Sequence, residues 1–157
     1  QIAAILVERN IPFVALERDA HAVRLARSQD LPVYFGDASR ADILEAARLS
    51  HARACVLTMH KDSGEAALVA VLRARHPKLP IFVRAHDWDH SSDLDAAGSS
   101  AVVEETAEMS LRLSALVLRS YGVPLEEVRA LNESLRGEDY AGLKTLVAER
   151  VKDAAKG

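Results

Sequence analysis

IPFVALERD (residues 11–19) and LPVYFGDAS (residues 31–39) are the two segments that decide the fold. Each contains a short apolar run that leads to a carboxylate, Glu17 in the first segment and Asp37 in the second. The residues between them have an amphipathic pattern and leave room for one helix. Because parallel strands need such a crossover, the pair predicts a strand–helix–strand unit of a parallel sheet.

Further apolar runs continue this pattern along the chain. Proline opens three of the runs, and proline is tolerated at the first position of a strand. The predicted strands are Phe13–Leu16, Val33–Phe35, Arg53–Thr58, Ile81–Val83 and Ala101–Val103. Their nearly unbroken hydrophobicity is typical of strands covered by helices on both faces. The predicted fold class is α/β, a Rossmann-like doubly wound parallel sheet.

The predicted helices between the strands follow short polar side chains that can cap them. These caps are Asp19 for Ala20–Gln29, Ser39 with Asp42 for Ile43–Ala47, Asp62 with Glu65 for Ala66–Arg75, and Asp87 or Asp89 for a short helix ending at Gly98.

The carboxyl-terminal third is predicted to be helical. An apolar helix reaches Gly122, and two amphipathic helices follow at Leu125–Leu135 and Tyr140–Val151, separated by a break at Arg136-Gly137. A surface helix this apolar usually packs against another part of the protein or against a partner. We therefore expect this tail either to fold back on the domain or to pair with a second subunit.

The amino terminus suggests a truncated domain. Gln1 to Arg9 has helical spacing but no preceding cap, so we expect the chain to start inside a helix. The first strand of the sheet and its glycine-rich turn would then precede Gln1. Residues 1–104 form the predicted nucleotide-binding domain. Residues 105–157 form a predicted helical arm, which would dimerise if it pairs with a second subunit and does not fold back on the domain.

Composition excludes several classes of protein. The 157 residues are 49% hydrophobic and 27% charged with a net charge of -3, which argues against disorder and nucleic-acid binding. The single cysteine, Cys55, excludes a disulfide framework. No apolar run approaches the roughly 20 residues that span a bilayer, so we expect the isolated chain to be soluble.

The first group of candidate ligand-binding residues follows the first two strands. Glu17 lies where a carboxylate of a Rossmann-like fold accepts hydrogen bonds from the ribose hydroxyls. Arg18 either pairs with a phosphate or is an ordinary solvated arginine. Gly36, Asp37 and Ala38 allow close approach of an adenine base, or they simply form a strand-to-helix turn.

The second group follows the later strands. Thr58, with Met59 after it, is predicted to face the crevice at the carboxyl ends of the strands, where ligands of open α/β sheets bind. Arg84 either holds a ligand phosphate or is paired with Glu104 or Glu105.

Neither a metal site nor a catalytic site is predicted. His86, Asp87, Asp89 and His90 have the composition of a metal cluster, but His86 precedes the predicted helix, which spoils the spacing of the two histidines. No arrangement of a nucleophile with a base is visible, so no catalytic residue is named.

Three segments resemble a known family: YFGDASR (residues 34–40), RAHDWDH (residues 84–90) and ETAEMSL (residues 105–111). They are similar to the TrkA-N domain, also called KTN or RCK, of potassium channels and transporters, above all in Kef-type and plastid KEA-type potassium efflux antiporters. The resemblance covers Gln1 to about Arg136.

This resemblance implies a homodimeric regulatory domain that binds AMP, ADP, ATP or NAD(H) and gates potassium–proton exchange. The transporter would be a transmembrane domain of the same polypeptide. The domain would lie at the cytoplasmic face of a bacterial inner membrane or the stromal side of a plastid membrane.

The resemblance also implies roles for single residues. Glu17 would bind the ribose, Asp37 and Ala38 would lie by the adenine, Thr58 would line the crevice, and Arg84 would face the phosphates. Bacterial Kef proteins sense glutathione through an arginine and an asparagine, and the matching positions here hold Glu104 and Asp139. A carboxylate in place of that arginine repels an anionic tripeptide, which argues against glutathione control.

Two alternatives remain open from the sequence. One is an NAD(P)-dependent oxidoreductase domain, although the tail from Thr106 onward contains no His or Cys and only the tyrosines Tyr121 and Tyr140. The other is a pure dimerisation module whose pocket no longer binds a nucleotide.

Overall fold

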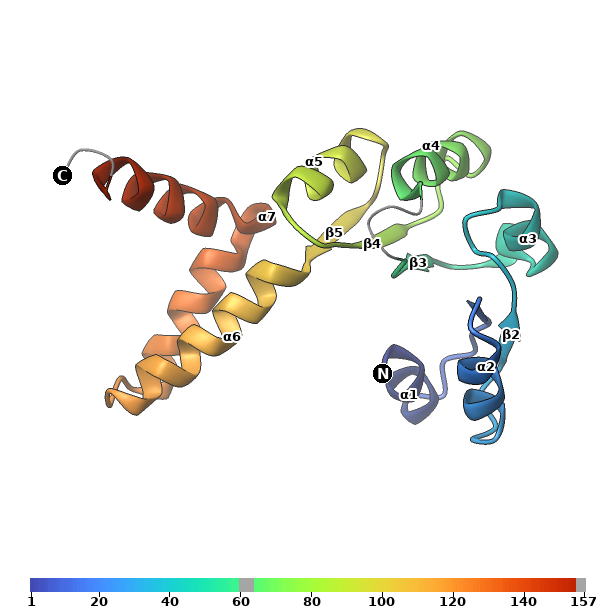
Figure 1. Cartoon of the computed structure of the whole chain (residues 1–157), viewed down its shortest axis with the longest axis horizontal. Coiled ribbons are helices and arrows are strands. Elements are labelled where there is room, and N and C mark those ends of the chain that lie inside the picture. The colour runs from blue at the N-terminus through green and yellow to red at the C-terminus, as the bar shows by residue number, and fades with distance from the viewer. Residues whose placement is uncertain (60–63, 155–157) are drawn as a thin grey trace.

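The computed structural model describes residues 1–59 and 64–154, except for the side chains of residues 138 and 151–154. Within these residues, short strands alternate with helices (Figure 1). The elements are α1 (Ile2–Glu8), β1 (Ala15–Glu17), α2 (Ala20–Arg27), β2 (Val33–Phe35), α3 (Ala41–Ala46), η1 (Leu49–His51), β3 (Cys55–Leu57), α4 (Glu65–Arg75), β4 (Ile81–Ala85), α5 (Trp88–Ala96), β5 (Ala101–Glu104), α6 (Glu105–Ser120) and α7 (Leu125–Ala154).

All strand pairs of the described residues are parallel. β1 pairs with β2 so that Glu17 lies opposite Phe35. β4 lies between β3 and β5, with Val83 opposite both Leu57 and Val102. The α/β class with parallel strands and a helical carboxyl-terminal extension is confirmed. Within the described residues, β1 and β3 are not hydrogen-bonded to each other, so the strands form two groups.

The main core lies between the strands β3–β5 and the helices α4 and α5. Its fully buried members include Val69, Leu72, Ile81, Val83 and Leu94. Figure 1 shows α4 and α5 on the same side of these strands. On the other face Val56, Phe82 and Val103 are exposed, so the predicted cover of both faces is not present for β3–β5 in the described part of the chain. α2 packs instead on β1 and β2.

Two of the predicted caps are confirmed. The Asp19 carboxylate accepts the backbone N–H of His21 at 2.7 Å at the start of α2, and the Asp87 carboxylate accepts that of His90 at 2.9 Å at the start of α5. Gly98, with φ of +97°, follows the end of α5 as predicted.

The predicted capping box of α3 is wrong. The N-cap of α3 is Arg40, which makes no side-chain capping bond. The Ser39 hydroxyl instead donates to Asp37 Oδ1 at 2.7 Å, so it stabilises the turn after β2. The predicted cap Asp62 lies outside the described residues.

Arg73 holds together the loops at the amino-terminal edge of β4 and β5. Its Nε donates to the carbonyl oxygen of Gly98 at 2.8 Å. Its Nη1 donates to the carbonyl oxygens of Pro77 and Leu79, both at 2.9 Å, and its Nη2 donates to Ser100 Oγ at 2.9 Å. One guanidinium from α4 thus satisfies acceptors on both loops that lead into these strands.

The helices α6 and α7 form a hairpin that projects from β5 (Figure 1). Ala107, Leu111 and Tyr140 are buried between them. Glu108 accepts two hydrogen bonds from Arg136, at 2.6 and 2.9 Å, and a third from the Tyr140 hydroxyl at 2.9 Å. The hydrogen bond from Arg136 is the main reason that the pKa of Glu108 is lowered.

The predicted break in the last helix occurs later than expected. α7 continues through Arg136 and Gly137, but Asp139 and Tyr140 have φ values of +53° and +61°, and the ribbon changes direction there (Figure 1). A Cβ on Gly142 would lie 3.0 Å from the carbonyl oxygen of Ser134, so the chain after the bend passes close to the chain before it.

Candidate functional site

The first two strands place Glu17 and Asp37 at one edge of the sheet. Glu17 ends β1, and Asp37 lies two residues beyond its register partner Phe35. The Glu17 Oε1 atom accepts the backbone N–H groups of Arg18 at 2.7 Å and Asp19 at 2.9 Å. These bonds fix the carboxylate at the strand end while leaving the side chain exposed. An acceptor held in this way is suited to receive hydrogen bonds from ribose hydroxyls.

Asp37 is held ionised by its neighbours. Its Oδ1 accepts from both the hydroxyl and the backbone N–H of Ser39, and its Oδ2 lies 3.9 Å from Arg18 Nη1. The Ser39 hydroxyl contributes most to lowering the pKa of the Asp37 carboxyl. Arg18 therefore spans the ends of β1 and β2, while its side chain remains largely exposed.

Gly36 is needed for packing at this strand end. A Cβ at this position would lie 3.2 Å from Ile43 Cγ2 and 3.3 Å from Leu16 Cδ2. The glycine thus allows α3 to approach β1 closely. The partly buried Ala38 packs against the main core, so only part of the predicted adenine surface faces outward.

The second group of predicted residues gathers around Arg84 at the carboxyl ends of β3 and β4. Arg84 Nη2 donates to the carbonyl oxygens of Thr58 at 2.9 Å and Met59 at 3.1 Å. Its Nη1 lies 3.3 Å from Glu105 Oε2, which is one of the two partners considered from the sequence. Arg84 thus joins the end of β3 to the start of α6.

Glu104, the other partner considered, has a different environment. Its side chain is 1% exposed and accepts the backbone N–H of Ala107, which caps α6. A buried carboxylate that is already used as a cap is not available to bind a ligand in this arrangement.

A buried acidic residue next to Arg84 was not predicted. Glu65, the first residue of α4, is 1% exposed, and its Oε2 lies 3.1 Å from Nε2 of His90, which is 7% exposed. Burial raises the pKa of the Glu65 carboxyl, against a smaller opposite influence of the Arg84 charge. The sequence did not reveal this because a glutamate in the first helical turn is usually solvated.

The two groups lie at the carboxyl ends of two sets of strands, β1–β2 and β3–β5, which are not hydrogen-bonded to each other in the described structure. Leu16 and Ala38 adjoin Glu17 and Asp37 of the first group, Met59 belongs to the second, and all three pack against the main core. The structure therefore brings Glu17, Arg18 and Asp37 together, and separately Thr58, Met59 and Arg84.

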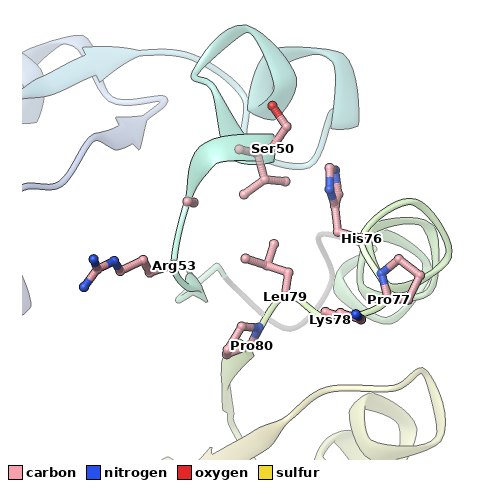
Figure 2. A pocket seen from close by; sticks show the side chains of 9 residues that line it. Ser50, Arg53, His76, Pro77, Lys78, Leu79 and Pro80 are labelled. Atoms are coloured by element: carbon pink, nitrogen blue, oxygen red, sulfur yellow. The ribbon is translucent and has the colours of Figure 1, made fainter.

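A cavity of about 440 Å³ lies at the opposite edge of the sheet, between η1 and the end of α4 (Figure 2). In Figure 2, Leu79 projects between Ser50 and Pro80, and His76 faces η1. His76 Nε2 also lies 2.5 Å from Glu45 Oε1. None of the predicted ligand-binding residues lines this cavity.

The described residues contain no group of three or more His, Cys, Asp or Glu side chains suited to a metal ion. His86 lies before α5, as predicted, and its Nδ1 is 3.9 Å from Glu105 Oε2. Among the helices of the described ranges, none is long and apolar enough to cross a membrane.

Comparisons with known proteins identify relatives over most of the chain. The chloroplastic K(+) efflux antiporter 2 of Arabidopsis thaliana is 39% identical over 145 residues, which are 92% of this chain and 12% of that protein. The glutathione-regulated potassium-efflux system protein KefC of Klebsiella pneumoniae is 31% identical over 99% of this chain and 25% of its own length. The chain thus spans a quarter or less of these relatives.

The solved GsuK channel has a similar fold. Bound to NAD, it matches 76% of this chain with 21% of its own chain, at a TM-score of 0.67 and 27% identity. Bound to ADP, it matches with a TM-score of 0.65 and 26% identity, over 76% of this chain and 31% of its own. The model of the TrkA-N domain family matches residues 1–105. The chain therefore belongs to the TrkA-N domain family, and it is homologous to domains of potassium efflux antiporters.

Proposed function

We propose that this chain is a regulatory domain that binds an adenine nucleotide or NAD(H) and controls potassium–proton exchange by a membrane antiporter. The observation that carries the proposal is the fixed Glu17 carboxylate, with Asp37 and Arg18 beside it at the carboxyl ends of adjacent parallel strands. Ligands of open α/β sheets bind at such strand ends.

In this proposal each residue recognises a different part of the nucleotide. Glu17 accepts from the ribose hydroxyls, Gly36, Asp37 and Ala38 lie by the adenine, Thr58 and Met59 line the crevice, and Arg18 and Arg84 are the cations available to phosphates. The GsuK structures with NAD and ADP support this choice of ligand class.

Regulation, rather than catalysis, fits the tail of the chain. Tyr121 is exposed at the tip of the α6–α7 hairpin, and Tyr140 is buried against Glu108. Neither is placed to donate a proton at the strand ends, as an oxidoreductase would require. The relatives are named as potassium efflux antiporters, which also supports a role in transport.

Glutathione control receives no support at the position that the family resemblance indicates. The Glu104 carboxylate is buried and caps α6, so it neither carries the needed positive charge nor reaches the surface.

The proposal is tested by calorimetric titration of NAD, ADP and AMP into the protein as its gene encodes it. One hydrogen bond to a charged group is worth about 1.5–3 kcal/mol, so Glu17→Ala is expected to weaken binding by at least about 10–100-fold. Glu127→Ala, which removes an exposed carboxylate on α7, is the control and is expected to bind as wild type. Wild-type protein that binds none of the three ligands would refute the proposal and favour a dimerisation module.

The second subunit of the proposed homodimer would pack on α6. Ala107, Leu111 and Ala115 face α7, whereas the opposite side of α6 is apolar and more than half exposed at Met109, Leu113, Leu116 and Val117. An apolar stripe of this kind on a soluble surface indicates an interface.

Sedimentation of two matched variants tests the dimer. Leu113→Asp places a charge in the stripe and is expected to weaken the dimer by at least about tenfold, because a central apolar contact is worth about 1–2 kcal/mol or more. Ser114→Asp adds the same charge beside the stripe and should leave the dimer intact. Equal dimerisation of both variants would place the interface elsewhere.

A further inference from the structure

Arg84 bonds with two elements that are distant in the sequence. Through Nη2 it holds the carbonyl oxygens of Thr58 and Met59 at the end of β3, and through Nη1 it holds the carboxylate of Glu105 in the first turn of α6. A guanidinium is planar and rigid, so it fixes the spacing of the groups that it binds. Arg84 therefore ties the end of β3 to the start of α6.

The start of α6 has further connections to the same region. The Thr106 hydroxyl donates to the carbonyl oxygen of His86 at 2.8 Å, and Glu105 Oε2 also lies 3.9 Å from His86 Nδ1. No residue separates β5 from α6, because β5 ends at Glu104 and α6 begins at Glu105. With no loop to absorb it, a shift of the first turn moves the helix as a whole.

A nucleotide phosphate would compete for Arg84. A guanidinium and a phosphate can form a bidentate pair of charge-assisted hydrogen bonds, which a single neutral carbonyl does not offer. The partners that Arg84 now has at the strand end are the neutral carbonyls of Thr58 and Met59, and its other partner, Glu105, is exposed enough to be released to water.

We propose that Arg84 and Glu105 form a coupling link, through which occupancy of the nucleotide site changes the position of α6 and of the apolar stripe on it. This inference rests on the proposed function. In it Glu105 is a positioning residue, which acts through Arg84 and does not touch the nucleotide.

The test separates nucleotide binding from its effect on α6. The protein as its gene encodes it is titrated with NAD and with ADP by calorimetry, and amide hydrogen exchange of residues 105–120 is then measured with and without saturating nucleotide. The variant is Glu105→Gln, which removes the charge from the link and keeps the size of the side chain. The matched control is Glu126→Gln, which breaks an exposed ion pair with Arg129 on α7.

The expected result is that wild type and Glu126→Gln both bind nucleotide and both change their exchange rates in α6. Glu105→Gln is expected to bind nucleotide at least as tightly as wild type, because Glu105 no longer competes for Arg84, but to lose most of the α6 response. Thr106→Val, which removes the second connection alone, should reduce the response less.

Two results distinguish the failure of this inference from that of the proposed function. Wild-type protein that binds neither nucleotide refutes the proposed function, and the coupling link with it. Wild-type protein that binds nucleotide without a change in α6, or a Glu105→Gln variant that binds and responds like wild type, overturns the coupling link alone. Should Glu105→Gln unfold, Glu105→Asp decides, because it keeps the charge but shortens the reach of the carboxylate toward Arg84, and a full wild-type response in it also overturns the link.

Discussion

Replacing Glu65 with glutamine should stabilise the chain at neutral pH. Both carboxylate oxygens of Glu65 are buried and only partly compensated, by His90 Nε2 at 3.1 Å from Oε2 and by the backbone N–H of Met59. An unsatisfied buried polar group costs about 1–3 kcal/mol, and more when it is charged. Since His90 and Arg84 offset part of this cost, we expect Glu65→Gln to raise the free energy of unfolding by about 1–2 kcal/mol at pH 8.

The gain should depend on pH with a definite sign. Burial raises the pKa of Glu65 above its ordinary value of 4.5, so the folded chain keeps a proton that the unfolded chain loses as the pH rises past that value. The stability that this proton supplies is therefore fully present below pH 4.5 and is lost as the pH rises through the folded-state pKa. Glutamine does not titrate, so the difference between variant and wild type should be near zero at about pH 4 and grow toward pH 8.

Urea unfolding, followed by circular dichroism from about pH 4 to pH 8, measures this difference. Glu126→Gln is the control, because that carboxylate is exposed and paired with Arg129 at the surface. A gain that is independent of pH, or a Glu65→Gln variant that is less stable than wild type at pH 8, would show that the buried carboxylate is adequately solvated or paired.

Two other predictions concern the glycine turns and the hairpin. Gly98→Ala should destabilise the chain by about 1–3 kcal/mol in urea unfolding, because its φ of +97° is strained for alanine and the new Cβ would lie 3.0 Å from Arg73 Cγ. Gly122→Ala, with φ of +85° and open space around it, should cost less, and equal losses would contradict the role of Arg73. Burial, with a hydrogen bond to Glu108, raises the pKa of Tyr140 to about 12, so the stability that this proton supplies below pH 10 should be lost as the pH rises through that pKa. Tyr140→Phe should flatten this alkaline loss, and an unchanged pH profile would refute the assignment.

The alternation of strands and helices was predictable because its causes are local. Apolar runs opened by proline, and the caps Asp19 and Asp87, are readable without knowledge of tertiary contacts. The capping box of α3 failed for a local reason too, since the Ser39 hydroxyl bonds to Asp37, which the spacing to Asp42 does not reveal.

Contacts between distant elements were less accessible from the sequence. Hydrophobicity identified β3–β5 as buried strands, but it does not say which face a helix covers, so the exposure of Val56 and Phe82 was not expected. The pairing of Glu65 with His90 joins the first turns of two helices and depends on how α4 packs against α5. The sequence offered Glu104 and Glu105 as carboxylate partners for Arg84. Choosing Glu105 required the register of β4 and β5.

The grouping of the candidate site residues was predictable only in outline. Carboxyl ends of parallel strands meet at one edge of a sheet, so the sequence predicts that Glu17 and Asp37 are neighbours. That Arg18 bridges them depends on a side-chain rotamer, which the sequence does not determine.

The hydrogen bonds made by Arg73 make the amino-terminal edge of β4 and β5 more rigid than their carboxyl-terminal edge. At the amino-terminal edge, one cation ties the entrances of β4 and β5 to α4 by hydrogen bonds to Gly98, Leu79 and Ser100. Because these bonds hold the amino-terminal edge in place, a movement that starts at the carboxyl ends of the strands is expected to rotate the α6–α7 hairpin and not to loosen the whole domain.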